Sequence, residues 1–128
     1  MNIEIRPSSI AVPVANYALA VLTTGATRWL HTSGVVPNRP DGTVPELLAD
    51  QAATVWSNVA AILAEAGMGS ADVVSITTYV VAGEALGPVM AARDAFMGST
   101  RAASTLVTVS ALARPEWRLE IAIVAAAS

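Results

Sequence analysis

Six short stretches of the chain have the apolar–polar alternation or the β-branched composition typical of strands. They are residues 2–6, 17–23, 27–33, 73–81, 103–110 and 117–124. Thr24-Gly25-Ala26 predicts a hairpin turn between the second and third stretches. Gly34 then opens a loop whose Pro, Asn and Gly content excludes regular structure as far as Gly42. Arg114-Pro115-Glu116 predicts a turn between the last two strands.

Two further stretches carry apolar residues at spacings of three and four, which predicts helices. The first helix should begin at Thr43-Val-Pro-Glu46, which has the form of a capping box, and should end at Gly67. The second helix, weakened by Gly87-Pro88, should run to about Met97. The order β-β-β-α-β-α-β-β over residues 1–128 therefore predicts a single α+β domain, in which one face of a sheet carries both helices.

The last two strands have unusual faces. In the last strand, one face would carry Trp117, Leu119, Ile121 and Ile123, and the other would carry Arg118, Glu120, Ala122 and Val124. In the strand before it, Thr105, Val107 and Val109 alternate with Ser104, Leu106, Thr108 and Ser110, so neither face is charged. A sheet face left to water normally carries Lys or Glu, so we expect another subunit to cover the face away from the helices.

Composition strengthens the expectation of subunit contacts. Hydrophobic residues make up 54% of the chain and charged residues 13%, which are respectively high and low shares for a globular protein. A net charge of −3 with seven scattered Arg residues argues against a nucleic-acid partner. The chain lacks a signal-peptide pattern and a membrane-length apolar run, so we expect a cytoplasmic protein without a membrane partner.

Several kinds of chemistry are excluded by residue types that the chain lacks. It has no Lys, which rules out a lysine Schiff base and a P-loop lysine, and no Cys, which rules out thiolate nucleophiles and cysteine metal sites. The one histidine, His31, cannot form a histidine pair for a metal. It fits a packed strand residue better than a catalyst, and no nucleophile-elbow sequence supports a triad of His31, Glu120 and a serine.

Glu120 is a lone acid in an otherwise apolar run, and three interpretations of it remain open. It can pair with Arg118, two residues away, or with an arginine of a neighbouring chain. It can act as a base or position a water in a cleft between subunits, because an enclosed carboxylate can hold and deprotonate water. It can also be simply exposed at a sheet edge.

Five segments in order, covering nearly the whole chain, resemble the RidA/YjgF family, also called endoribonuclease L-PSP. They are Tyr17 with the strand after it, Thr32-Ser33-Gly34-Val35-Val36-Pro37, the helix 58–67, the strand 72–80, and Leu119-Glu120-Ile121. The second segment is similar to the family's Ser-Gly-Gln-Ile-Pro, with Val35 in place of Gln. The first departs from Gly-Pro-Tyr, because Ala15-Asn16 precede the tyrosine.

The resemblance implies a chorismate-mutase-like fold with a mostly antiparallel sheet, a homotrimer, and clefts between subunits that take a small-molecule ligand. It also implies cofactor-free hydrolysis of reactive imines and enamines to 2-keto acids and ammonia. A strand Glu helps to place the water in such proteins, which corresponds to Glu120, and Tyr17 and Ser33 also carry over. Gly34 would let a ligand or second chain approach the backbone closely.

The family's carboxylate-binding Arg is missing from this chain. Counting back from Val107-Thr108-Val109 places Ser104 on the arginine position, and we expect Ser104 and Leu106 to line the pocket. Arg101 is a poor substitute, because three residues along a strand reverse the face. These observations predict a divergent deaminase-type hydrolase with weak or no activity on 2-imino acids. A non-catalytic binding or scaffold trimer is the alternative.

Overall fold

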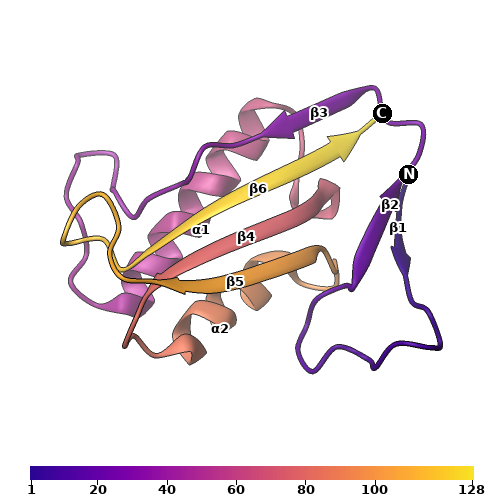
Figure 1. Ribbon diagram of the computed structural model, residues 1–128. Coiled ribbons are helices and arrows are strands. Elements are labelled where there is room, and N and C mark those ends of the chain that lie inside the picture. Colours follow the sequence, from indigo (N-terminus) through magenta and orange to yellow (C-terminus); the bar gives the residue numbers. More distant parts are fainter.

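The structure is a computed structural model that describes residues 1–128. Its elements in chain order are β1 (Asn2–Ile5), β2 (Ala20–Thr23), β3 (Arg28–His31), α1 (Leu48–Glu65), a 3-10 turn η1 (Ser70–Asp72), β4 (Val73–Val81), α2 (Leu86–Met97), β5 (Ala103–Val109) and β6 (Leu119–Ala127). Four strands form one sheet in the order β3-β6-β4-β5, and α1 and α2 both lie behind it (Figure 1). The α+β class and the single layer of helices are confirmed.

The sheet is antiparallel except at one edge. β6 lies between β3 and β4 and is antiparallel to both, whereas β4 and β5 are parallel neighbours joined by the crossover helix α2. The predicted hairpin at residues 24–26 is wrong: β2 pairs with β1 in a separate two-stranded sheet, and β3 pairs with β6. Gly25 does take a positive φ of 69°, but β3 finds its partner almost a hundred residues further along the chain.

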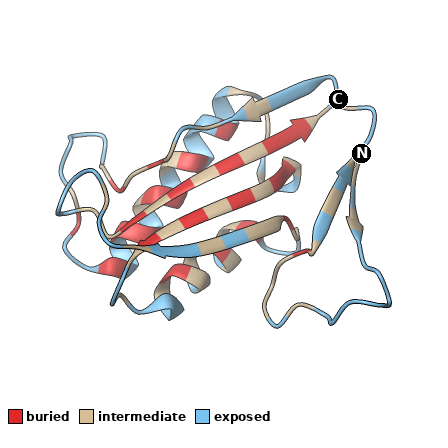
Figure 2. Ribbon diagram, viewed as in Figure 1, coloured by how far each residue is buried: buried red, intermediate tan, exposed pale blue.

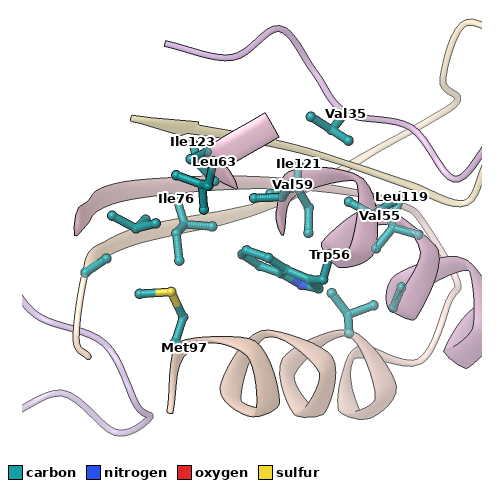
Figure 3. Close-up of a cluster of buried hydrophobic side chains, with 14 of the residues drawn as sticks. Val35, Val55, Trp56, Val59, Leu63, Ile76, Met97, Leu119, Ile121 and Ile123 are labelled. Atoms are coloured by element: carbon teal, nitrogen blue, oxygen red, sulfur yellow. The ribbon is translucent and has the colours of Figure 1, made fainter. Parts of the chain in front are cut away.

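The hydrophobic core fills the space between the sheet and the helices. α1 contributes Ala52, Val55, Trp56, Val59 and Leu63, while β6 contributes Leu119, Ile121 and Ile123 (Figure 3). Trp56 stacks on Phe96 of α2 with their ring centroids 4.8 Å apart. The alternation of buried and less buried residues along β4 and β6 is visible in Figure 2. Each fully buried Val, Leu or Ile side chain of this core stabilises the fold by about 1.5–3 kcal/mol relative to leaving that side chain exposed.

The start of α1 differs from the prediction. The helix begins at Leu48 after Leu47, without a side-chain cap, and the predicted capping box at Thr43 and Glu46 does not form. The Thr43 hydroxyl instead donates to Asp41 at 2.7 Å, as part of a local turn that precedes the helix. The predicted C-terminal stop is confirmed, because Gly67 has a positive φ of 68°. None of the helices has both the length and the apolar character needed to cross a bilayer.

Candidate functional site

Glu120 lies on the face of the four-stranded sheet that the helices do not cover, here called the open face. Its neighbours Leu119 and Ile121 point the other way and are fully buried in the core, while Glu120 is half-buried. Paired residues on adjacent strands share a face, so the register defines this surface. It comprises Glu120, Ala122 and Val124 of β6, Thr77 and Tyr79 of β4, and Thr105 and Val107 of β5.

Gly34 lies directly against the Glu120 carboxylate. A Cβ built on Gly34 would stand 2.5 Å from the carboxyl carbon of Glu120 and 2.8 Å from its Cγ, which is closer than real side chains approach. Any residue other than glycine would therefore force the Glu120 side chain to move. The need for glycine here comes from this close approach, and the neighbour that it accommodates is a side chain of the same subunit.

The Gly34 backbone reaches this position through a bulge. His31 pairs with Val124, and Val35 pairs with Ile121, so four steps along one strand match three along the other. The extra residue falls in the segment that contains Ser33 and Gly34, as in a β-bulge, which bends the strand and redirects its side chains. Ser33 is exposed next to Gly34 at this bend. The structure therefore brings Ser33, Gly34 and Glu120 into one neighbourhood.

The structure separates Ser104 and Leu106 from Glu120. Ser104 pairs with Ile76 and Leu106 pairs with Thr78, both of which are buried residues on the helix-facing side of β4. Leu106 accordingly packs against the hydrophobic core. Within one chain, these two residues therefore lie on the opposite face of the sheet from Glu120. That they line a pocket between subunits stays a prediction.

Thr105 and Val107 are the residues of β5 that share the face of Glu120. Val107 is the β5 partner of Tyr79, and Tyr79 is the β4 partner of Glu120, so the three side chains form a row across the open face. Thr105 is exposed and lies two residues along β5 from Val107. The alternation of residues 103–110 does not by itself show which set of side chains faces the helices, because the pairing with β4 decides this.

Tyr17 lies at the outer edge of the sheet. The next residue, Ala18, forms a parallel bridge to Ala103 of β5, and the carbonyl of Tyr17 accepts a hydrogen bond of 2.6 Å from the Arg101 guanidinium. Tyr17 thus lies near the beginning of β5, close to Ala103, which precedes Thr105 by two residues. Tyr17 does not contact Glu120 within one chain, because β4 and β5 stand between them.

No arginine of the same subunit pairs with Glu120. Arg118 approaches Glu84 at 3.5 Å, which removes it from the partnership considered for it. Arg101 bonds to Glu4 at 3.1 Å, and the Arg6 guanidinium bonds to the same carboxylate at 2.6 Å. These bonds hold the pKa of Glu4 below its ordinary value, the one from Arg6 first. Glu120 therefore has no ion-pair partner within the chain.

The open face can hold a small polar molecule by hydrogen bonds rather than by opposite charge. Glu120 supplies a carboxylate, Tyr79 a phenol, Thr77 and Thr105 hydroxyls, and Val107 an apolar wall. A carboxylate of this kind can orient a water molecule or accept its proton. The structure contains no cluster of three or more His, Cys, Asp or Glu residues that could hold a metal ion.

Known proteins that resemble this chain share its architecture. A family model described as Endoribonuclease L-PSP matches residues 8–127. The crystal structure of the Rid-family protein YyfB from Yersinia pestis has 30% identity and a TM-score of 0.88, with 98% of each chain covered. NMB1025 from Neisseria meningitidis, a YjgF-family protein, has 32% identity and a TM-score of 0.66 over 86% of each chain.

A curated relative shows a shorter match. The RutC family protein of Aquifex aeolicus is 35% identical over 78 residues, which is 60% of this chain and 60% of that protein. The YyfB structure, by contrast, is covered almost end to end, and the family model also spans almost the whole chain. On this basis the chain belongs to the endoribonuclease L-PSP family, which is also known as the RidA/YjgF family.

Proposed function

We propose that this protein is a homotrimer whose open sheet faces meet, and that the clefts between subunits take a small reactive metabolite. Glu120 positions the water or proton there. The observation that carries the proposal is the placement of Glu120. It is a half-buried carboxylate without an ion-pair partner, it lies against Gly34, and its neighbours on the strands of the open face are uncharged. Tyr17 and Ser33 are the further contacts proposed for the ligand, contributed by whichever subunit borders the cleft.

The proposed reaction is hydrolysis of an imine or an enamine-derived imine. A water held by Glu120 attacks the carbon of the C=N bond, and Glu120 accepts the water's proton as the C–O bond forms. Glu120 returns this proton to the nitrogen, which gives a carbinolamine. The hydroxyl proton of the carbinolamine then passes to the amine nitrogen through Glu120, the C–N bond breaks, and ammonia leaves as the carbonyl forms. One imine and one water thus give one carbonyl compound and one ammonia, without a redox step or a cofactor.

The preferred substrate should lack a carboxylate. Thr105 and Val107 offer no positive charge beside Glu120, and Arg101 and Arg118 are each bonded to another acid. Each charge-assisted hydrogen bond that a carboxylate would forgo is worth about 1.5–3 kcal/mol. Activity on 2-imino acids is therefore expected to be weak or absent. Ribonuclease activity, which the family's older name implies, is disfavoured by the net charge of −3.

A non-catalytic binding or scaffold trimer is the second candidate. It is favoured by the same lack of a cationic anchor on the open face, since a protein that had lost turnover would not need to hold a substrate carboxylate. Glu120 and Gly34 would then serve to bind a ligand without reaction.

The rate at which an imine is hydrolysed distinguishes the proposed hydrolase from the non-catalytic trimer. An amine oxidase generates a neutral imine from a primary amine, and the rate of ammonia release is compared for wild type and Glu120→Gln. The proposal expects the wild-type protein to accelerate ammonia release and Glu120→Gln to lose about 10²-fold or more of that acceleration. Acceleration that is retained in Glu120→Gln would overturn the role of Glu120. No acceleration by wild type would support the binding candidate.

A further inference from the structure

The side chain of Asn58 ties α1 to the loop that carries Gly34. Its Nδ2 donates to the carbonyl of Val36 at 3.1 Å and to the carbonyl of Asn38 at 2.9 Å. Both hydrogens of the amide are thereby used, and both bonds are partly shielded from water. Residues 36–46 contain no helix or strand, so side-chain bonds of this kind replace the ladder that would hold a strand in place.

The loop that Asn58 holds is also bonded to β6 immediately beside Glu120. Val35 donates its amide to Ile121 at 2.7 Å, and Ile121 donates its own amide back to Val35 at 3.0 Å. Val35 follows Gly34, and Ile121 follows Glu120. This reciprocal pair of hydrogen bonds fixes how closely the Gly34 backbone lies against the Glu120 carboxylate, because Val35 is bonded directly to Gly34 and Ile121 directly to Glu120.

A third bond joins the same loop to the residues that precede β6. The indole Nε1 of Trp117 donates to the side-chain oxygen of Asn38 at 3.0 Å. Asn38 thus links Asn58 on one side to Trp117 on the other, three residues before Glu120. The hydrogen bonds form a closed ring. It runs from Asn58 through Asn38 to Trp117, along the chain to Ile121, across to Val35, and through Val36 back to Asn58.

We propose that Asn58 is a positioning residue, which sets the place of the Gly34 backbone against Glu120 by holding the carbonyls of Val36 and Asn38. This inference rests on the function proposed above for Glu120, and it adds a residue that does not touch the ligand. An aspartate at position 58 would have nearly the same size but no donor, and its charge would repel the two carbonyl oxygens. An alanine would remove the donor without adding a charge.

Amide hydrogen exchange tests the positioning role without reference to turnover. In Asn58→Ala and Asn58→Asp, the amides of Val35 and Ile121 are expected to exchange about 10- to 100-fold faster than in wild type. Core amides of β4 should change much less. Val55→Ala, which opens a cavity in the core, serves as the matched control: it should speed exchange across the whole sheet. Ser57→Ala, at the neighbouring exposed position on α1, should change neither the exchange of Val35 and Ile121 nor that of the core amides.

The two proposals fail in different ways. Unchanged exchange at Val35 and Ile121 in both Asn58 variants, or an increase that is uniform as in Val55→Ala, would overturn the positioning role, whatever the activity. A local increase in exchange supports it, even if wild type shows no imine hydrolysis and the proposed function fails. Where wild type is active, kcat should fall about tenfold in Asn58→Asp, and Ser57→Ala should match wild type.

Discussion

The two faces of the four-stranded sheet are built from the same strands but follow different rules. On β6, Leu119, Ile121 and Ile123 point to the helices and are at most 2% exposed, whereas Glu120 and its neighbours on the open face remain half-buried. The helix side is apolar and closely packed, and so it holds the fold together. The open side has no such task within one chain, and it is the side on which the proposed assembly and chemistry would take place.

The largest expected effect comes from placing a charge in the middle of the open face, on the central strand β6 rather than on the edge strand β5. Ala122→Arg would put a guanidinium at the centre of the proposed subunit contact, where an unpaired buried charge costs about 3–5 kcal/mol. We expect the variant to dissociate, and light scattering measures this as a fall in mass from three times the 13.1 kDa of the chain. Ser57→Arg, on the outer surface of α1, is the control. Equal masses for wild type and Ala122→Arg would show that this face is not shared.

A core substitution on the opposite face should act on folding. Ile121→Ala removes a fully buried side chain from beneath α1, and we expect the free energy of unfolding to fall by about 2–5 kcal/mol. Denaturant unfolding measures the loss. Val107→Ala, which truncates a side chain that is 40% exposed, provides the comparison. Both substitutions are made in a protein that also carries Ala122→Arg and is therefore expected to be monomeric. Similar losses in the free energy of unfolding for Ile121→Ala and Val107→Ala would show that the two faces contribute equally to the stability of the fold.

The contact between the loop and Glu120 predicts a specific coupling. Gly34→Ala should cost about 1–3 kcal/mol of stability, because its Cβ would overlap the carboxylate. Combining it with Glu120→Ala removes the atoms that collide, so most of the loss should disappear. Denaturant unfolding of the four proteins of this double-mutant cycle gives the interaction energy. Additive losses would show that Gly34 is needed for another reason.

The smallest effect concerns acid. Glu4 is bonded by Arg6 and then by Arg101, so its pKa in the folded protein lies below the ordinary value of 4.5. A lowered pKa gives stability that is present above pH 4.5 and is lost as the pH falls through the folded pKa. Wild type should therefore lose slightly more stability than Glu4→Gln between pH 5 and about pH 3, as measured by thermal unfolding. An identical acid response would contradict the linkage.

Local periodicity was enough to predict part of the fold. The bounds of β4 at residues 73–81, the stop of α1 at Gly67, and the end of α2 at Met97 all follow from patterns within a few residues. The hairpin at residues 24–26 could not be predicted correctly, because the partner of β3 is β6 at the far end of the chain. The helix start was misplaced because Thr43 bonds to Asp41 within the loop.

The candidate site shows the same limit. Glu120 could be found from the sequence as a lone acid on an apolar strand, and the alternation of β6 gave its face. The face of β5 could not be found, because neither of its two sets of side chains carries a charge, and only the parallel pairing with β4 decides between Ser104 and Thr105. Asn58 gave no sequence signal, since its partners are backbone carbonyls.

An arginine placed on each face in turn tests the central claim most directly. Thr105→Arg adds a guanidinium on the face of Glu120, and Ser104→Arg adds one to the adjacent residue on the helix side. Hydrolysis of 2-iminopropionate, generated by an amino-acid oxidase, should rise about tenfold or more in Thr105→Arg alone and should be lost again when Glu120→Gln is added. A larger gain in Ser104→Arg than in Thr105→Arg would contradict the assignment of the open face as the working face.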